Sequence, residues 1–99
     1  MDPLLSLLRE RSFRKGTFTL ASGKQSDFFI DCKATVLRAD GHRLVGEALL
    51  ASMREHTPNA RAVAGVALGG CSLASAVALT SALREGAAID AVLAGAPVA

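Results

Sequence analysis

The longest run of the chain without a charged residue predicts a strand followed by a helix. Residues 62–68 are apolar and include two valines, which is typical of a strand buried on both faces. Gly69 and Gly70 then interrupt the run. Alanine and leucine recur at helical spacing after this pair, so we expect a helix over residues 72–84 with Ser72 as its N-cap.

The Gly-Gly pair gives this strand–helix unit its candidate chemistry. The first turn of a helix leaves backbone N–H groups unpaired and carries a partial positive charge, and glycine lets a ligand approach the backbone closely. A phosphate or a carboxylate fits such a place. A plain tight turn is the simpler interpretation of two glycines, and the segment matches neither the Walker pattern nor Gly-x-Gly-x-x-Gly. The residues alone leave both interpretations open.

The N-terminal third of the chain predicts a short helix followed by a hairpin. Asp2 and Pro3 suit the N-cap and the first position of a helix. Residues 18–20 alternate apolar and polar, residues 28–33 are rich in aromatic and β-branched side chains, and the polar loop 21–27 lies between them. Three phenylalanines flank this loop: Phe18, Phe28 and Phe29. They suit either a planar anionic ligand or a small core for the hairpin.

The remaining pattern predicts a further helix and a βαβ unit. Residues 40–56 have apolar side chains at helical spacing, with Asp40 as the expected cap. The expected apolar stripe of this helix is Leu44, Val45, Ala48, Leu49 and Met53. Residues 89–93 resemble a second short buried strand, which should pair in parallel with residues 62–68 because a helix connects the two. The expected fold class is therefore α/β.

Composition narrows the classes of function. The chain has 99 residues, enough for one small domain, and its 51% hydrophobic and 20% charged residues indicate a globular protein. A net charge of +2 is too small to argue for nucleic-acid binding. The uncharged run is long enough to cross a bilayer, but its many small residues and the lack of Trp and Tyr argue against a membrane span. Two cysteines outside metal-ligand spacing, and an N-terminus unlike a signal peptide, favour the cytoplasm.

Two segments, in this order, carry a family resemblance. Residues 16–31 read Gly-Thr-Phe-Thr-Leu-Ala-Ser-Gly-Lys-Gln-Ser-Asp-Phe-Phe-Ile-Asp, and residues 64–74 read Ala-Gly-Val-Ala-Leu-Gly-Gly-Cys-Ser-Leu-Ala. Together they closely resemble the N-terminal half of the orotate phosphoribosyltransferase family. The resemblance implies a partial type I phosphoribosyltransferase fold, with a parallel-sheet βαβ core, an N-terminal helix and a β hood. The helix and hood would occupy residues 1–38 and the incomplete α/β core residues 39–99 of a single domain.

The resemblance also implies an activity and its partners. The family transfers the 5-phosphoribosyl group of 5-phosphoribosyl 1-diphosphate (PRPP) to orotate, with Mg²⁺, giving orotidine 5′-phosphate and diphosphate in pyrimidine biosynthesis. Its members are usually homodimers. Eight substrate-binding residues carry over by position: Phe29 and Ile30 in the orotate pocket, Leu68, Gly69 and Gly70 in the diphosphate loop, and Ser22, Gly23 and Lys24 in the hood loop. We expect the orotate pocket and the diphosphate loop to share one cavity, and no catalytic residue or metal ligand carries over.

The sequence also departs from the family. Some members have lysine where this chain has Ala21 and Gly69, and many close relatives have glutamate in place of Ala67. After residues 92–93 the chain does not continue with the family's mobile basic loop or its acidic PRPP-binding motif, so we expect a truncated chain that is inactive alone. The alternative is a non-catalytic module that binds orotate or an anion, or that dimerises. The Phe-Phe-Ile-Asp segment beside Ser-Gly-Lys argues against a phosphoribosyltransferase for another base.

Overall fold

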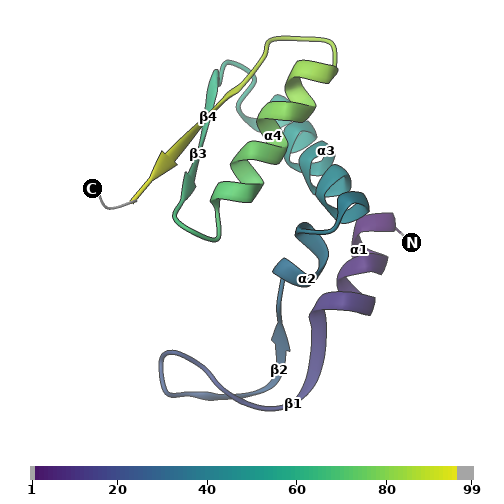
Figure 1. The fold of residues 1–99 in the computed structure, drawn as a ribbon, viewed down its shortest axis with the longest axis vertical. Coiled ribbons are helices and arrows are strands. Elements are labelled where there is room, and N and C mark those ends of the chain that lie inside the picture. Colours follow the sequence, from purple (N-terminus) through teal and green to yellow (C-terminus); the bar gives the residue numbers. More distant parts are fainter. Residues whose placement is uncertain (1, 96–99) are drawn as a thin grey trace.

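The protein folds into a hairpin unit and a helix–sheet unit, as seen in a computed structural model that describes residues 2–95 (Figure 1). The elements in chain order are α1 (Pro3–Leu7), the π-helical turn η1 (Leu8–Ser12), β1 (Phe13–Thr19), β2 (Gln25–Ile30), α2 (Lys33–Val36), α3 (Ala39–His56), β3 (Ala62–Val66), α4 (Cys71–Leu83) and β4 (Asp90–Ala94). The strands form two separate two-stranded sheets, β1–β2 and β3–β4. None of the helices in residues 2–95 is long and apolar enough to cross a membrane.

The N-terminal helix and the hairpin confirm the prediction. Asp2 caps α1, because its carboxylate accepts the N–H groups of Leu4 and Leu5 at 2.8 and 3.3 Å. The chain passes through η1 into β1, which pairs antiparallel with β2. A two-stranded hairpin is marginally stable in isolation. The hairpin therefore depends on contacts between its base and the rest of the protein for its stability.

The start of α3 differs from the prediction. The helix begins at Ala39, and Arg38 occupies the N-cap position without a side-chain hydrogen bond to the helix. Asp40 lies inside the first turn, where its carboxylate binds the guanidinium of Arg11. The expected Asp40 cap is wrong because the ion pair with η1 takes its place.

The core of the protein lies between α3, α4 and the residue that precedes β4. Leu50, Val77 and Ile89 form its buried cluster. Three partly buried side chains pack against this cluster: Leu49, Met53 and Val63. The predicted stripe on α3 is thus only the edge of the buried face, since α4 packs on the side that carries Gly46 and Leu50 while Ala48 is exposed.

The predicted βαβ unit is confirmed, but its strands are less buried than expected. β3 and β4 pair in parallel along their full lengths, and α4 connects them. Gly65 is the one buried residue of β3, and Val66 is 66% exposed. Val92 and Leu93 of β4 are also exposed. The prediction that these strands are buried on both faces is therefore wrong for the described chain. α4 packs on the sheet and also on α3 (Figure 1).

The start of α4 also differs from the prediction. The helix begins at Cys71, and Gly70 occupies the N-cap position without a side-chain hydrogen bond. Ser72 is therefore the second residue of the helix and does not cap it. No side chain of the described residues accepts a hydrogen bond from the free N–H groups in the first turn of α4.

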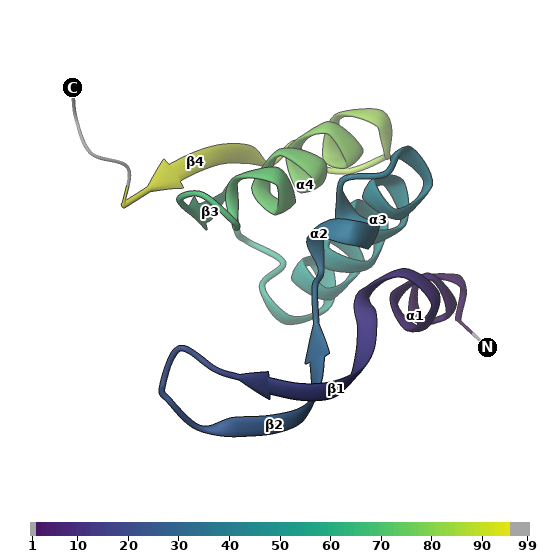
Figure 2. The ribbon, with the colours of Figure 1, turned by 60° about the horizontal axis from the view of Figure 1, so that its bottom comes forward.

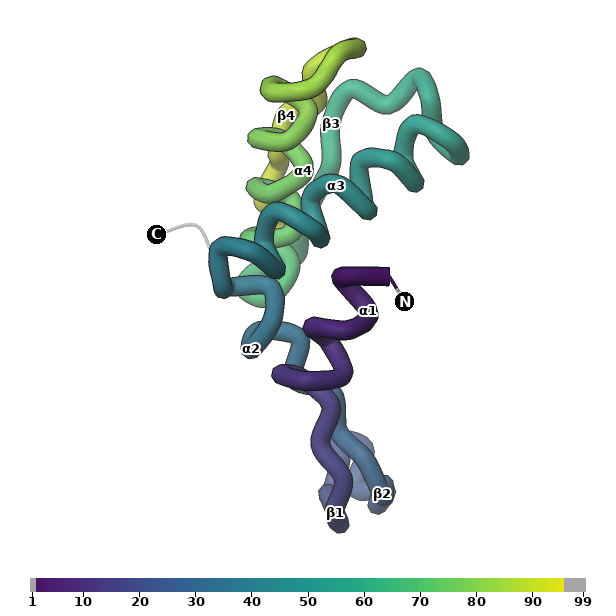
Figure 3. Tube along the Cα trace, turned by 90° about the vertical axis from the view of Figure 1, so that its right-hand side faces the viewer, coloured from purple at the N-terminus to yellow at the C-terminus, as the bar shows by residue number. Residues whose placement is uncertain are grey.

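The molecule is extended for its size. Its Cα radius of gyration is 15.2 Å, whereas a compact domain of this length has about 13 Å. Its accessible surface is 7054 Å², against roughly 5,300 Å² expected for a folded monomer of this mass. The hairpin contributes much of the large radius and surface area, because it extends away from the helices (Figures 2 and 3).

Candidate functional site

The turn between β3 and α4, residues 67–70, is held by backbone hydrogen bonds. Gly70 N–H donates to Val66 O at 2.8 Å, and Cys71 N–H donates to Leu68 O at 3.1 Å. Within residues 2–95, the N–H groups of Gly69, Ser72 and Leu73 donate to no protein acceptor. The turn is thus fixed in place while three of its neighbouring donors stay available, which is the arrangement that binds an anion at a helix start.

A cavity of about 640 Å³ opens at this turn. We call it the turn cavity, and its lining residues are Lys33, Leu37, Leu68, Gly69, Cys71 and Ser72. Its volume is that of a small-molecule site, typically about 300–1,000 Å³. Two exposed leucines supply an apolar wall, the start of α4 supplies hydroxyl and N–H donors, and a lysine supplies a positive charge. This combination suits a ligand with an anionic end and an apolar body.

The two glycines of the turn have different physical roles. A Cβ at Gly69 would meet nothing within 4 Å, so this position faces open space at the cavity. A Cβ at Gly70 would lie 2.7 Å from the backbone nitrogen of Val66. Gly70 is therefore required for the close approach of the turn to β3, whereas Gly69 leaves its backbone accessible to a ligand.

The hood-loop residues lie at the tip of the hairpin. Leu20 N–H donates to Lys24 O at 2.8 Å and Gly23 N–H donates to Leu20 O at 2.9 Å, which closes the turn. Gly23 has φ of +85°, a backbone conformation that residues other than glycine rarely adopt. Ser22 and Lys24 are exposed on this tip. The tip is therefore a tight turn with its polar side chains directed to solvent.

The phenylalanines divide between the two faces of the hairpin. Phe18 and Phe29 pack with ring centroids 5.7 Å apart, and Phe13 and Phe28 pack 5.9 Å apart. Because Phe28 and Phe29 are adjacent on β2, their side chains point to opposite faces. The sequence grouped Phe18, Phe28 and Phe29 together, but the structure places Phe28 with Phe13, and Ile30 is 48% exposed beside them.

The hairpin tip and the β3–α4 turn point to the same side of the molecule, with α2 between their bases (Figures 1 and 2). The turn cavity brings Leu68 and Gly69 together with α2. Phe29, Ile30 and the hood-loop residues are not among its lining. A single cavity that joins the hairpin to the turn stays a prediction.

Three polar contacts hold the base of the hairpin. The hydroxyls of Ser12 and Thr35 lie 2.6 Å apart and are both fully buried, and Asp31 N–H donates to Ser12 O at 2.9 Å. Arg11 donates two hydrogen bonds to Asp40, at 2.8 and 3.0 Å. Hydrogen bonding from Arg11, together with the Gly41 N–H, lowers the pKa of Asp40 to about 2. These contacts link η1 to α2 and α3, and so set the direction in which the hairpin leaves the core.

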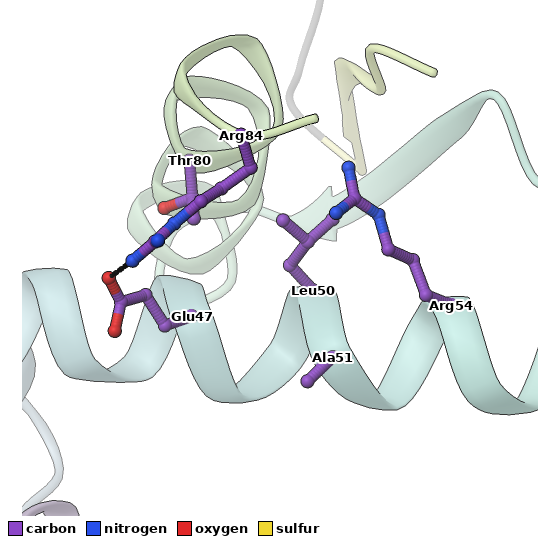
Figure 4. Close-up of a pocket in the computed structure, with 6 residues that line it drawn as sticks. All are labelled: Glu47, Leu50, Ala51, Arg54, Thr80 and Arg84. Atoms are coloured by element: carbon purple, nitrogen blue, oxygen red, sulfur yellow. Dashed lines mark hydrogen bonds and ion pairs between the residues drawn. The ribbon is translucent and has the colours of Figure 1, made fainter. Parts of the chain in front are cut away.

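A second, smaller cavity of about 200 Å³ lies between α3 and α4 (Figure 4). Arg84 forms an ion pair with Glu47 across the two helices. The Nη2 of Arg54 is buried against the loop that carries Gly86 and has no hydrogen-bond partner among residues 2–95. We assign the charged groups here to helix packing, because the Arg84–Glu47 pair joins α3 to α4 directly.

Sequence reasoning missed Lys33, Leu37 and Cys71 as cavity residues. Residues 28–33 were expected to form one strand, but β2 ends at Ile30 and α2 begins at Lys33. The available signal was the break in the aromatic and β-branched pattern at Asp31. A four-residue helix gives no periodicity of its own, so its direction was not predictable.

Comparisons with known proteins place the fold. No protein-family model matches the chain. A solved phosphoribosyltransferase from Corynebacterium diphtheriae superposes with a TM-score of 0.70 at 27% identity, over 95% of this chain and 50% of its own. The fold therefore belongs to the class of type I phosphoribosyltransferases, as expected.

The sequence relatives carry a more specific name within this class. The orotate phosphoribosyltransferase of Sorangium cellulosum is 59% identical over 83 residues, which is 84% of this chain and 43% of that protein. The Mycobacterium tuberculosis orotate phosphoribosyltransferase, solved in complex with 5-phospho-α-D-ribosyl 1-diphosphate, has a TM-score of 0.63 at 29% identity, over 92% of this chain and 50% of its own. The chain is thus orotate phosphoribosyltransferase-like, and it spans about half the length of the relatives it matches.

Proposed function

We propose that this chain supplies the orotate-binding and diphosphate-binding part of an orotate phosphoribosyltransferase of pyrimidine biosynthesis. Such an enzyme transfers the 5-phosphoribosyl group of PRPP to orotate and releases orotidine 5′-phosphate and diphosphate. The observation that carries the proposal is the turn cavity, where free N–H donors, a cation and an apolar wall meet at the Gly69 turn. We place the reaction in the cytoplasm, in keeping with the free thiols of Cys32 and Cys71.

Each predicted residue has a defined task in this proposal. The loop of Leu68, Gly69 and Gly70 receives the diphosphate, which accepts hydrogen bonds from the free N–H groups at this turn. The hairpin contributes Phe29 and Ile30 to the orotate site, and Ser22, Gly23 and Lys24 lie at the tip beside the ligands. Support comes from the exposed position of the hairpin side chains and from the shared direction of the hairpin tip and the turn (Figures 1 and 2).

The chemistry assigned to the turn is electrostatic. As the bond between ribose and diphosphate breaks, negative charge grows on the diphosphate and positive charge on the ribose. Preorganised N–H donors stabilise the growing negative charge without having to reorganise. Gly69, Ser72 and Leu73 contribute such donors, and the fixed Gly70 backbone holds them in position.

The Mg²⁺ that the family implies does not fit a protein site in the described chain. Residues 2–95 contain no group of three or more His, Cys, Asp or Glu side chains placed to hold a metal, and the turn cavity has no carboxylate lining. Mg²⁺ commonly binds through substrate phosphates. We therefore assign no metal ligand to this chain.

An assay with two readouts tests the proposal. The 99-residue sequence contains no Asp-Asp-x-x-Thr-Thr-Gly segment to hold the ribose, so we expect binding of orotate and of diphosphate but little turnover. Orotidine 5′-phosphate formation should be at least about a hundredfold below that of the complete Sorangium cellulosum relative. Titration calorimetry should detect both ligands. A folded chain that binds neither ligand would contradict the proposal. Turnover equal to that of the relative would show that catalysis does not need the Asp-Asp-x-x-Thr-Thr-Gly segment.

A non-catalytic binding or dimerising module is the second candidate. The observation that favours it is the exposed apolar surface of the β3–β4 sheet, where Val66, Val92 and Leu93 are all largely accessible. The same assay separates the two functions. Binding without turnover, even when the chain is mixed with the C-terminal half of the Sorangium cellulosum relative, would favour the module.

A further inference from the structure

Lys33 faces the β3–α4 turn from the other side of the turn cavity. It is the first residue of α2, and it lines the cavity together with Leu37, Gly69 and Ser72. Lys33 and Leu37 are four residues apart, so they share one side of this short helical segment. The lysine is therefore the positively charged group on the wall that faces the free N–H donors of the turn.

The backbone that carries Lys33 is held firmly. Thr35 and Val36 of α2 are buried, and the Thr35 hydroxyl contacts that of Ser12. His42 Nδ1 lies 3.0 Å from Val36 O. These contacts fix the direction of α2, so the side of the helix with Lys33 stays turned toward the cavity.

Lys33 is available to a ligand. Arg11 is paired with Asp40, and Arg43 and Arg84 are both paired with Glu47. Within residues 2–95, Lys33 makes no ion pair or side-chain hydrogen bond, and the cavity lining contains no acidic residue. An ammonium group has three donors and no acceptor, so its natural complement in this cavity is an anion.

We propose that Lys33 is a further substrate-binding residue, whose ammonium group pairs with the diphosphate held at the Gly69–Ser72 turn. This inference rests on the proposed function and adds a residue to it. The turn donates N–H groups from one wall, and Lys33 donates from the other. A diphosphate has enough oxygens to accept from both walls at once.

Calorimetric titration with inorganic diphosphate tests this pairing. Lys33→Gln should weaken diphosphate binding roughly fivefold, as expected for loss of one partly exposed charge pair. Lys33→Arg should restore most of the affinity, and Lys15→Gln should change nothing, because Lys15 lies on the hairpin outside the cavity. The difference between wild type and Lys33→Gln should shrink at high salt, since screening weakens exposed charge pairs. The unfolding temperature of Lys33→Gln should match that of wild type.

The outcomes separate this inference from the proposed function. Equal diphosphate affinity of wild type and Lys33→Gln would overturn the role of Lys33 and leave the diphosphate site standing. Equal weakening of diphosphate binding by Lys15→Gln would also overturn the role of Lys33, because the loss of affinity would then follow from the lower net charge of the protein. A folded wild-type chain that binds no diphosphate would overturn the proposed function, and the role of Lys33 with it.

Discussion

At the scale of single residues, the two adjacent glycines of the β3–α4 turn combine a packing role and a proposed binding role in one motif. The sequence treats Gly69 and Gly70 alike, and both interpretations of the pair, a plain turn and an anion site, fit it. The structure assigns the close packing to Gly70, which touches β3, and the cavity to Gly69. The plain-turn interpretation thus describes Gly70, and the anion site stays a prediction for Gly69.

Alanine substitutions separate these roles. Gly70→Ala should destabilise the protein by about 1–3 kcal/mol, because the new Cβ meets the Val66 backbone, which cannot easily shift. Gly69→Ala should stay within about 0.5 kcal/mol of wild type, since its Cβ faces open space. Urea unfolding of both variants gives the two values. Equal destabilisation by both would contradict the assignment.

At the scale of elements, the regular patterns were predictable and the short or capped segments were not. The βαβ unit and the hairpin follow from long apolar or alternating runs. The cap of α3 was wrong because Asp40 binds Arg11, which lies 29 positions earlier in the chain. α2 was missed because its four residues are held by the buried side chains of Thr35 and Val36, a tertiary effect that no local pattern records. The division into residues 1–38 and 39–99 stays a prediction.

The Ser12–Thr35 contact offers a test of how the hairpin is held. Thr35→Val leaves the buried Ser12 hydroxyl without its side-chain partner, which should cost about 1–3 kcal/mol. The double variant Ser12→Ala with Thr35→Val should lose less than the sum of the single variants, because both hydroxyls are then removed together. Thermal or urea unfolding provides the values, with Thr19→Val on the exposed part of β1 as the control. Strict additivity would show that the two hydroxyls do not depend on each other.

At the scale of the whole molecule, the described chain leaves much apolar surface uncovered. Parallel sheets are ordinarily covered on both faces, yet β3 and β4 are largely exposed. Together with the large surface area, this argues that further polypeptide, of the same or of another chain, packs on the sheet or on the hairpin. Because members of the proposed family are usually homodimers, we expect a second copy of this chain to cover part of this surface.

Light scattering after size exclusion measures the association directly. We expect a mass of about twice 10.2 kDa at tens of micromolar protein, with dissociation on dilution. The physical reason is the removal of the exposed valines and leucines from water. A mass of 10.2 kDa at every concentration would contradict a homodimer of this chain.

The central claim is that the β3–α4 turn binds diphosphate while the hairpin binds orotate. Titration of the ¹⁵N-labelled chain, followed by amide chemical shifts, tests it most directly. The account predicts saturable shifts at Gly69, Ser72 and Leu73 with inorganic diphosphate, and at Phe29 and Ile30 with orotate. A folded chain whose shifts stay unchanged at these positions, or change only around Arg54 and Arg84 between α3 and α4, would contradict it.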